Sequence, residues 1–596
     1  MADSAIVVEG LTKRFGSVLA LDHVDFDVPA GSVFGLLGPN GSGKTTLIRI
    51  LTTILRADSG HAAVLGLDVA REPAGVRSQV GLAGQFAAVD QNLTGRENLR
   101  LMGRLAQMSR AEFRPRVEEL LERFNLADAA AKPVRTYSGG MRRRLDVAAA
   151  LVAHPPVLFL DEPTTGLDPQ SRNQLWDMIR ELVAEGSTVL LTTQYLEEAD
   201  RLTQRIAVLD RGRVIANDTP AALKARLGTT VIELAMRDQN VAAEAEQLLT
   251  RGLGSRPDRD GSTLRLTSND GSRVLIDALH LLDDRRLDPI ALEVRAPSLD
   301  EIFLVLTDGH APAAAAPTVR AREPGHDTAP ALVALRRPVR RRPLGSTRDA
   351  LAVAGRNLIA LRRVPRLIVF STIQPLVFVF LFRYVFGGVA AKALPGIPYV
   401  DYLMPGVFVQ AAVFGGMNSA VGLATDLQSG LLERFRSLPM ARSAVLAGRT
   451  IADLARNVFI VTLMTAVGFA VGFRIHIGIG PYLAGMALVL LFSLAMSWIF
   501  AVVGLAVGDP ETAQAAAFPV MTPLVFASSA FIPVNTMPGW LQGFARHQPV
   551  SVTASAVRAL VLGGPTGTYV WQSVAWLVGI VVVFAPLGVW RYRHAV

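Results

Sequence analysis

The sequence predicts a multidomain chain: a soluble α/β domain with a small C-terminal α+β appendage, followed by an all-α membrane domain with six spans. Its 596 residues exceed what one hydrophobic core normally holds, so several domains are expected. The first part alternates short apolar runs with charged, periodic stretches, which is typical of strands and helices in an α/β domain. Beyond residue 366, apolar segments reach ~20 residues, the length that crosses a hydrocarbon core.

Composition divides the chain into four parts. We expect the α/β domain over residues 1–227 and the appendage over 228–308, where strand-like "TVIELAM" and "STLRLTS" flank a helix-like segment. An aperiodic stretch rich in Ala, Pro and Arg over 309–346 is typical of a flexible linker, and the membrane domain follows over 347–596. The linker also holds a cluster of arginines, which either contact anionic lipid or are simply solvated: Arg336, Arg337, Arg340, Arg341 and Arg342.

The net charge of +9 comes almost wholly from arginine, because the chain holds only five lysines. We interpret this bias as that of a GC-rich bacterial genome. The basic residues neither line one amphipathic face nor alternate with aromatics, so no nucleic-acid partner is expected. Without cysteine the chain forms no disulfide and no thiolate metal site. The first residues lack the pattern of a signal peptide, so we expect the N-terminus in the cytoplasm.

The membrane domain is expected to be multi-pass, with both ends in the cytoplasm. Arginines precede the first span, lie between the second and third, and follow the last, as the positive-inside rule expects. Few charges fall within the spans, with Arg383 and Asp426 near span ends, so an ion pathway is not favoured. The polar segment 534–564 predicts interfacial helices, with a plain outer loop as the alternative. The predicted spans cover about 367–386, 403–424, 457–473, 482–507, 515–533 and 571–590.

The motif "GLLGPNGSGKTT" carries the most specific chemical signal in the chain. It follows an apolar, strand-like run and opens a helix-like run, as a phosphate-binding loop does. Glycines let backbone N–H groups curl around phosphate oxygens, Lys44 reaches the outer phosphates, and the Thr45 hydroxyl ligates magnesium. The predicted phosphate-binding residues are Gly38, Pro39, Asn40, Gly41, Ser42, Gly43, Lys44, Thr45 and Thr46.

Two further motifs carry acidic and anion-binding groups. In "PPVLFLDEP" a buried strand is predicted to present Asp161, suited to hold magnesium through water, and Glu162, suited to act as general base. Alone this pair also fits a surface turn, but beside a phosphate loop it indicates hydrolysis. In "TYSGGMRRRLDVA" Ser138, Gly139 and Gly140 open a helix whose N–H groups either bind an anion or are simply capped.

The order of these motifs, with "GLD" ending at Asp168, resembles that of ABC transporters whose nucleotide-binding domain is fused ahead of the membrane domain. The resemblance covers nearly the whole chain and implies an ATP hydrolase coupled to transport, with ATP and Mg²⁺ as cofactors. It places Gln85 of "GLAGQF" on the magnesium ion and Phe15 of "TKRFG" on the adenine, and it includes Asp168 in the nucleotide site. Taken alone, Gln85 would be a loop amide and Phe15 a core aromatic.

The closer resemblance is to ABC-2-type drug exporters of the daunorubicin-resistance kind, through "TYSGGMRRRLDVA", "LTTQYLEEAD" and "APSLDEIFLVLT". An amphipathic segment before the first span and the inner loop "TDLQSGLLERFRSLPMARS" fit the same family. On that loop Glu433, Arg434 and Arg436 are expected either to dock near Gln85 or to snorkel at the membrane interface.

The resemblance implies a homodimer of half-transporters, in which Ser138 to Gly140 of one subunit face the nucleotide on Lys44 of the other. It implies ATP-driven export of hydrophobic or amphipathic drugs, antibiotics or lipids across a bacterial cytoplasmic (inner) membrane, with the nucleotide-binding domain in the cytoplasm. Other functions left open are export of a cell-envelope glycolipid or polysaccharide, mechanotransmission without cargo, and a soluble ATPase acting on ribosomes or DNA. Six aromatics either line an apolar translocation surface or merely pack helices: Phe378, Phe380, Phe408, Phe414, Phe518 and Phe526.

Gln194 follows the strand-like "STVLLTT", where most ABC ATPases carry a histidine that contacts the γ-phosphate. A glutamine amide donates a hydrogen bond to phosphate but cannot become cationic. A neutral bond contributes about 0.5 to 1.5 kcal/mol, against about 1.5 to 3 with a charged partner. We predict that hydrolysis is retained, with Glu162 as the base and Gln194 as a phosphate contact. The alternative is that Gln194 satisfies backbone groups at the strand end.

Overall fold

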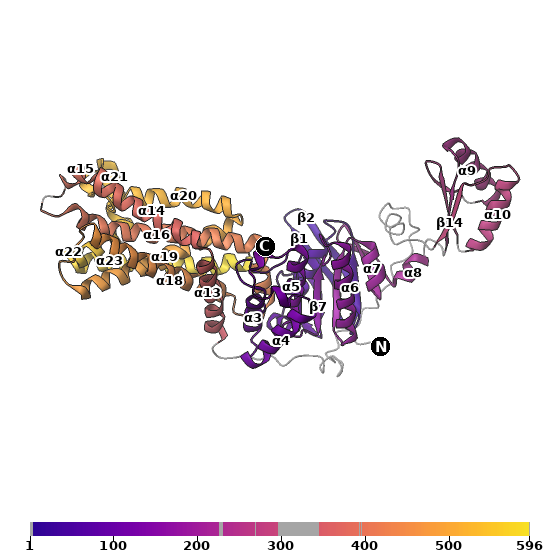
Figure 1. The fold of residues 1–596 in the computed structure, drawn as a ribbon, viewed down its shortest axis with the longest axis horizontal. Coiled ribbons are helices and arrows are strands. Elements are labelled where there is room, and N and C mark those ends of the chain that lie inside the picture. Colours follow the sequence, from indigo (N-terminus) through magenta and orange to yellow (C-terminus); the bar gives the residue numbers. More distant parts are fainter. Residues whose placement is uncertain are drawn as a thin grey trace. The chain divides into compact units, whose positions relative to one another are not determined.

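The structure is a computed structural model that describes residues 4–225, 230–254, 256–268, 270–295, 345–392, 394 and 396–594 (Figure 1). The motif "APSLDEIFLVLT", the linker arginines and nearly all of the predicted linker lie outside these residues. The chain forms two compact units, one of Met1–Gln85 with Pro155–Arg337 and one of Phe86–His154 with Pro338–Val596. The predicted domain 1–227 is therefore divided between the two units, because residues 86–154 pack with the membrane helices.

The first unit is built on a six-stranded sheet with the order β10-β9-β3-β8-β7-β6. Every residue of β3, β7 and β8 is buried, which explains their continuous apolar runs. All neighbours pair in parallel except β10, which runs antiparallel to β9. The strands are β3 (Val33–Leu37), β6 (Val80–Ala83), β7 (Val157–Asp161), β8 (Thr188–Thr193), β9 (Arg205–Asp210) and β10 (Arg213–Asp218).

A second, antiparallel sheet with the order β2-β1-β4-β5 shares an apolar core with the first sheet. Its strands are β1 (Ser4–Phe15), β2 (Val18–Pro29), β4 (Ser59–Val64) and β5 (Leu67–Asp68). The helices of this part are α1 (Lys44–Leu51), α2 (Pro73–Gln79), α6 (Pro169–Ala184), α7 (Leu196–Leu202) and α8 (Pro220–Ala225). This arrangement is an α/β fold with parallel strands at its centre.

Residues 230–295 form an antiparallel sheet with the order β12-β13-β11-β14 and two helices around a separate apolar core. The strands are β11 (Thr230–Ala235), β12 (Asp258–Asp260), β13 (Thr263–Ser268) and β14 (Ala291–Arg295). The helices are α9 (Gln239–Leu253) and α10 (Gly271–Asp283).

The second unit begins with a helical segment at residues 86–154. Helices α3 (Gly95–Leu105) and α4 (Arg110–Arg123) each start with a capping box, in which Thr94 pairs with Glu97 and Ser109 with Glu112. Two short 3₁₀ turns, η1 (Ala127–Ala129) and η2 (Val134–Thr136), lead to α5 (Gly139–Leu151).

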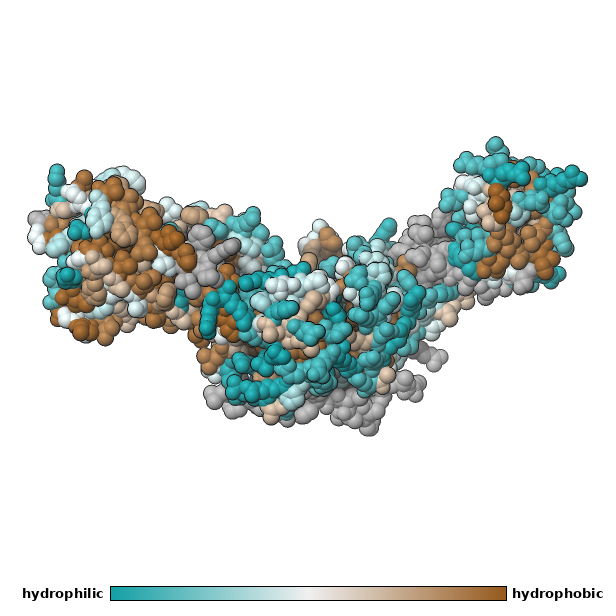
Figure 2. Space-filling model, in the orientation of Figure 1, coloured by the Kyte–Doolittle hydropathy of each residue, from teal (hydrophilic) through white to brown (hydrophobic). Residues whose placement is uncertain are grey.

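The rest of the second unit is helical, and apolar side chains cover much of its visible face in Figure 2. Among the described residues, four helices are long and apolar enough to cross a membrane, and two shorter apolar helices accompany them. The long helices are α16 (Tyr399–Gln428), α18 (Ser443–Ala470), α19 (Ile479–Val507) and α23 (Thr566–His594). The others are α13 (Gly345–Arg363), α14 (Pro365–Phe380), the π-helical η3 (Leu381–Val385), α15 (Gly387–Ala391), α17 (Leu431–Ser437), α20 (Pro510–Phe526), η4 (Val534–Thr536), α21 (Gly539–His547) and α22 (Pro549–Leu562).

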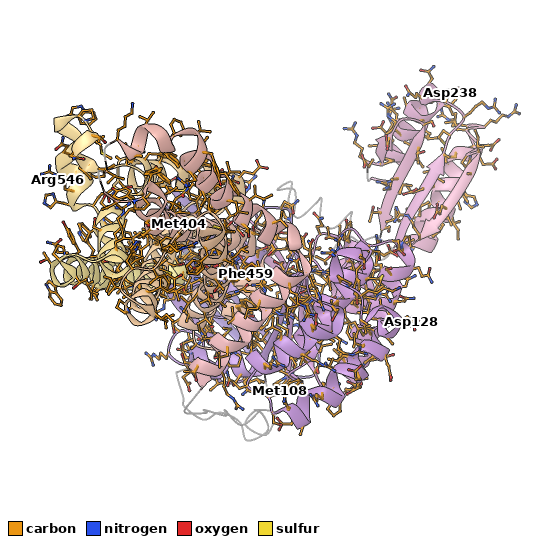
Figure 3. The ribbon with its side chains drawn as sticks, turned by 60° about the vertical axis from the view of Figure 1, so that its left-hand side comes forward. Met108, Asp128, Asp238, Met404, Phe459 and Arg546 are labelled. Carbon is orange, nitrogen blue, oxygen red and sulfur yellow. The ribbon has the colours of Figure 1, made fainter. Side chains whose placement is uncertain are left out.

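Each predicted span overlaps a helix, although a count of six spans stays a prediction. The first corresponds to α14 with η3, and the fifth to α20, which ends at Phe526 rather than near residue 533. Helix α16 is the most buried of the long helices, and Met404 on it lies among the other helices, whereas Phe459 on α18 is exposed (Figure 3). Gly406 brings α16 against the turn after α20, where an added Cβ would lie 1.8 Å from the Ala530 carbonyl oxygen.

Segment 534–564 is helical, so the alternative of a plain loop is wrong. Helix α21 exposes Trp540 and Phe544, whereas most of α22 is buried against α16, α19 and α23. Arg558 of α22 is buried and places its guanidinium 3.6 Å from the centre of the Tyr402 ring. An interfacial position of these helices stays a prediction, and the small residues of α22 allow it to pack closely on its neighbours.

Two charged residues lie buried on α18 just before the predicted third span. Helix α18 begins at Ser443, well before the predicted third span at 457, and it buries Asp453 and Arg456. These charges pair with each other at 3.2 Å, and Asp453 also accepts a hydrogen bond from Ser419 on α16. A hydropathy window starts the span only after these charges, because it scores each residue by type and does not register the partner that compensates its charge.

Candidate functional site

The central sheet brings most of the predicted site residues to one edge. The strands β3, β8, β7 and β6 are parallel neighbours, with Leu37 opposite Thr193 and Asp161 opposite Thr192. Gly38, Gln194 and Glu162 directly follow the carboxyl ends of β3, β8 and β7, and Gln85 lies two residues after the end of β6. Open α/β sheets place ligands at this edge.

The loop from Gly38 to Gly43 runs from β3 into the N-terminus of α1. An added Cβ on Gly38 would lie 2.2 Å from the Leu209 carbonyl oxygen, so only glycine fits at the start of the loop. The Ser42 hydroxyl oxygen is buried and has no hydrogen-bond partner among the described residues. A buried polar atom of this kind at a helix N-terminus fits an anionic ligand such as phosphate. Pro39, Asn40 and Gly41 are exposed, and Thr45 and Thr46 are half-buried in the first turn of α1.

Lys44 points back over this loop. Its Nζ donates hydrogen bonds to the carbonyl oxygens of Gly38 at 2.7 Å and Pro39 at 3.1 Å, and lies 3.8 Å from Glu162 Oε1. The side chain is 5% exposed, and burial lowers the pKa of the Lys44 ammonium although Glu162 and Asp161 oppose the shift. The ammonium is therefore held where the phosphate loop and the acidic strand end meet.

Thr192 positions the acidic pair, and sequence reasoning did not single it out. Its hydroxyl donates to Asp161 Oδ1 at 2.5 Å and accepts the Glu162 N–H at 3.0 Å. Glu162 has a φ of +47°, a strained conformation for a residue with a side chain. The signal that was available is the pair of threonines that ends an otherwise apolar strand.

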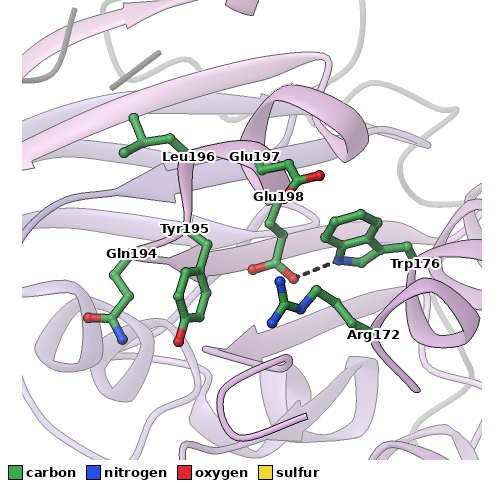
Figure 4. Close-up of a pocket in the computed structure, with 7 residues that line it drawn as sticks. All are labelled: Arg172, Trp176, Gln194, Tyr195, Leu196, Glu197 and Glu198. Atoms are coloured by element: carbon green, nitrogen blue, oxygen red, sulfur yellow. Dashed lines mark hydrogen bonds between the residues drawn. The ribbon is translucent and has the colours of Figure 1, made fainter. Parts of the chain in front are cut away.

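Gln194 lies directly after β8 and is half-buried, and its side chain makes no hydrogen bond to the other described residues. It lines a pocket of about 190 Å³ together with Arg172, Trp176, Tyr195, Leu196, Glu197 and Glu198 (Figure 4). Glu198 is fully buried there and accepts a hydrogen bond from Trp176 Nε1 at 3.1 Å. Burial raises the pKa of the Glu198 carboxyl, although hydrogen bonds from Thr193, Trp176 and Thr164 oppose the shift. Glu198 thereby anchors α7, the helix that begins two residues after Gln194.

Phe15 and Asp168 lie on the surface of the first unit. Phe15 ends β1, is 42% exposed, and has the Lys13 Nζ 5.5 Å from its ring centre. An exposed ring is available for stacking, so the core alternative for Phe15 does not hold. Asp168 caps α6 by accepting hydrogen bonds from the N–H and hydroxyl of Ser171, which lower the pKa of its carboxyl.

Ser138, Gly139 and Gly140 belong to the second unit, at the start of α5. The Ser138 hydroxyl accepts the Met141 N–H at 3.2 Å, which is an ordinary helix cap. Ser138 and Gly139 are exposed, so the N–H groups of this helix start face solvent.

A buried ion-pair network joins the segment after Gln85 to the membrane helices within the second unit. Arg356 of α13 donates from Nε to Asp90, and from Nη1 and Nη2 to the two oxygens of Asp426 at 2.9 and 2.5 Å. Arg363 of the same helix donates from Nη1 and Nη2 to the two carboxylate oxygens of Glu97. Its Nη1 also donates to the Asn92 carbonyl oxygen at 3.0 Å. Burial disfavours the charged Glu97, but the Arg363 and Thr94 hydrogen bonds outweigh it and lower the pKa of Glu97.

The inner loop forms α17, which packs on α5. Arg434 is buried, donates to the Asp146 carbonyl oxygen at 3.1 Å, and lies 3.8 Å from the Asp146 carboxylate. Burial raises the pKa of Asp146 although Arg434 and Arg143 oppose the shift. Glu433 is half-buried and Arg436 lies 5.6 Å from the ring centre of Tyr592. Arg434 therefore docks on residues 86–154, as one of the two expectations had it, and does not snorkel.

Comparison with known proteins matches both halves of the chain. The model of the ABC transporter family matches residues 21–165, and that of the ABC-2 type transporter matches residues 349–562. The chain is 52% identical over 307 residues to the daunorubicin/doxorubicin resistance ATP-binding protein DrrA of Streptomyces peucetius, covering 51% of this chain and 93% of that protein. It is 46% identical over 311 residues to the doxorubicin resistance ATP-binding protein DrrA of Mycobacterium tuberculosis (strain ATCC 25618 / H37Rv), covering 51% of this chain and 94% of that protein. It is 39% identical over 301 residues to the Nod factor export ATP-binding protein I of Ralstonia nicotianae, covering 50% of this chain and 92% of that protein.

Replacing Thr192 with valine tests the support of the acidic pair. We expect Thr192→Val to lower the kcat of ATP hydrolysis by about tenfold, because leaving the buried Glu162 N–H with a poorer partner costs about 1–3 kcal/mol. The control is Thr188→Val at the opposite end of the same strand, where the hydroxyl accepts the Gly31 N–H at 2.9 Å. Thr188→Val should lower the melting temperature about as much as Thr192→Val does. It should leave kcat per folded molecule unchanged. Equal kcat values for the two variants would contradict the assignment.

Proposed function

Because the chain belongs to the ABC transporter family, with an ATP-hydrolysing half fused to an ABC-2-type permease half, we propose that it exports hydrophobic or amphipathic compounds such as drugs, antibiotics or lipids. The observation that carries the proposal is the 52% identity to a daunorubicin/doxorubicin resistance protein over 93% of that protein's length. An apolar aromatic cluster in the permease half supports the export proposal. The Phe531 ring stacks on two others, with its centroid 4.3 Å from that of Phe382 and 5.4 Å from that of Phe378. Such a cluster suits contact with a flat aromatic or apolar compound.

The residues at the sheet edge take complementary roles toward ATP as substrate. The loop N–H groups and Lys44 bind the phosphates, Phe15 stacks on the adenine, and Gln194 donates a hydrogen bond to the terminal phosphate. Glu162 accepts the proton of the attacking water. When bound, Mg²⁺ neutralises charge on the phosphate oxygens. The oxygen atoms of Thr45, Gln85 and Asp161 are of the hard type that Mg²⁺ prefers, so these residues would hold it.

The working assembly is a homodimer, because one chain carries one nucleotide-binding half and one permease half. The exposed start of α5 at Ser138 to Gly140 is suited to meet the phosphates held by a second copy, and Asp168 is assigned to the nucleotide site as well. Both ATP sites would then have the same residues. The protein is multi-pass in the bacterial cytoplasmic membrane, with lipid around its helices and the nucleotide-binding half in the cytoplasm.

Motion passes from the ATP site to the permease through α13 and α17. The segment that follows Gln85 carries Asp90 and Glu97, and each pairs with an arginine of α13. Arg434 of α17 makes a third connection, to the Asp146 carbonyl oxygen. Packed ion pairs of this kind transmit displacement because they shift between discrete arrangements instead of deforming continuously.

Cargo of another kind is the second candidate. The chain is also 39% identical to an ATP-binding protein of Nod factor export, so relatives of the nucleotide-binding half serve different cargo. Export of a cell-envelope glycolipid or polysaccharide is therefore the alternative. Mechanotransmission without cargo would call for a large outer domain, whereas the described residues between α20 and α23 form only the short elements η4, α21 and α22.

Purified protein in liposomes tests the export proposal. A panel of amphipathic drugs and cell-envelope lipids is added, and ATP hydrolysis and movement of each compound are measured for the wild type and Glu162→Gln. We expect at least one compound to stimulate hydrolysis and to be moved by the wild type alone, because Glu162→Gln removes the base. If drugs fail and an envelope lipid succeeds, the alternative cargo holds; if nothing moves, export is rejected.

Removing the Gln194 amide tests its assigned phosphate contact. We expect Gln194→Ala to bind ATP but to hydrolyse it roughly 2- to 10-fold more slowly, which corresponds to the loss of one neutral hydrogen bond. The exposed Gln170 on α6 offers the matched control, Gln170→Ala, which should leave turnover unchanged. Unchanged turnover in Gln194→Ala would assign Gln194 to backbone support instead.

The pair Arg363–Glu97 tests the transmission path. We expect Arg363→Gln and Glu97→Gln each to lower the number of molecules transported per ATP by roughly fivefold, at the weak end of allosteric coupling, and the double variant to lose no more than either. Arg96, also on α3, forms a bidentate pair with Glu118 on α4 and provides the control Arg96→Gln, for which the ratio should not change. Additive losses in the double variant would show that the two residues do not act as a pair.

A further inference from the structure

A cavity of about 440 Å³ lies inside the second unit, at the junction of α13, α16 and α18 with the segment around Asp90. Its volume falls in the range of roughly 300–1,000 Å³ that small-molecule sites occupy. The charged residues that line it are four arginines and three aspartates: Arg135, Arg356, Arg449, Arg456, Asp90, Asp426 and Asp453. The wall therefore carries one positive charge in excess.

All the carboxylate oxygens in this wall already have partners. Asp90 accepts the Asn92 N–H through Oδ1 and Arg356 through Oδ2. Asp426 accepts Arg356 through both oxygens. Asp453 accepts Ser419 through Oδ2 and pairs with Arg456 through Oδ1. The cavity thus offers no spare carboxylate to a cation.

Hydrogen-bond donors, in contrast, are left over. Among the described residues, Arg449 donates only from Nη2, to the Asn418 carbonyl oxygen at 2.9 Å, and its Nε and Nη1 lie 3.9 Å from carboxylate oxygens of Asp453 and Asp426. Arg456 is 8% exposed, and its Nε has no partner among the described residues. The Asn357 amide nitrogen on α13 is also buried without one. Buried donors without partners call for an acceptor that the protein itself does not supply.

The backbone makes room for the arginine with the most spare donors. An added Cβ on Gly422 of α16 would lie 1.6 Å from Arg449 Nη2, so the guanidinium occupies the space that any side chain would take. Glycine at this position lets the Arg449 guanidinium lie in close contact with the α16 backbone at the cavity wall. A planar guanidinium fixed in this way presents its remaining N–H groups in a fork that matches phosphate oxygens.

We propose that this cavity binds a phosphate group, carried by an anionic lipid headgroup or by a soluble phosphate, through Arg449, Arg456 and Asn357. Basic pockets between helices at the cytoplasmic side of a membrane domain are suited to lipid headgroups. The same donors would hold a soluble phosphate ester. The bound phosphate bridges α13, α16 and α18 beside the Arg356 network, and so stiffens the connection between the nucleotide-binding and permease parts. The proposal is independent of the cargo.

Thermal unfolding of the full chain in detergent tests the site. Every sample carries Lys44→Ala, which weakens phosphate binding at the loop by the same amount throughout. The probes are inorganic phosphate, phosphatidylglycerol, and diacylglycerol with the same acyl chains but no phosphate. We expect inorganic phosphate or phosphatidylglycerol to raise the melting temperature with a saturating dose response, and diacylglycerol to have no such effect. A response to phosphatidylglycerol alone identifies a lipid headgroup, and one to inorganic phosphate identifies a soluble ligand.

Variants decide whether the response belongs to the cavity. Arg449→Gln should weaken the apparent affinity about tenfold, as the loss of one charge-assisted contact predicts. Arg449→Lys keeps the charge without the fork and should give an intermediate loss, which preserves the test if Arg449→Gln folds poorly. The matched control is Arg362→Gln, which removes an exposed arginine of α13 that does not line the cavity. No response in any sample, or the same affinity in the Arg449 variants as in the Arg362 control, overturns the proposal.

Discussion

The buried guanidinium of Arg356 is the interaction on which the second unit depends. It holds Asp90, from the motif-bearing part of the chain, and Asp426, at the end of α16, in one hydrogen-bonded cluster. Burial would favour the neutral guanidine, but the attraction of Asp426 and Asp90 outweighs it and raises the pKa of Arg356. Breaking a buried pair costs far more than an exposed one, because a charge is left uncompensated. Removing any one of Arg356, Asp90 and Asp426 is therefore expected to destabilise the whole cluster.

A second constraint acts at the sheet edge. Parallel pairing places the carboxyl ends of β3, β7 and β8 side by side. Strand pairing, and not the conformation of a loop, therefore brings together three segments that are far apart in the sequence. Strand ends placed by a buried sheet are more rigid than loop tips, which suits groups that must align with a phosphate. The strained backbone of Glu162 persists there because Thr192 holds its N–H through both the carbonyl oxygen and the hydroxyl.

Local patterns predicted much of the fold and part of the site. The phosphate loop, the acidic strand end and Gln194 were found because each motif stands at a strand end marked by a continuous apolar run. Thr192 was missed because the two threonines at the end of its apolar strand do not by themselves indicate a role, which depends on the acidic pair of the neighbouring strand. Asp453 and Arg456 were missed because their partners lie on adjacent turns and on α16, which hydropathy does not register. Long-range pairing of polar groups is what the sequence left undetermined.

The assignment of residues 86–154 to the second unit has a consequence for how such proteins are recombined. The chain leaves the α/β unit after Gln85, forms the segment that carries Asp90, Glu97 and Asp146, and returns at Pro155. A chimera cut at the linker would exchange the permease without the surface that fits it. Modular exchange of permeases should therefore carry this inserted segment along with the membrane helices, so that the joints at Gln85 and Pro155 fall at the boundaries between the two units and not across the ion pairs of the second unit.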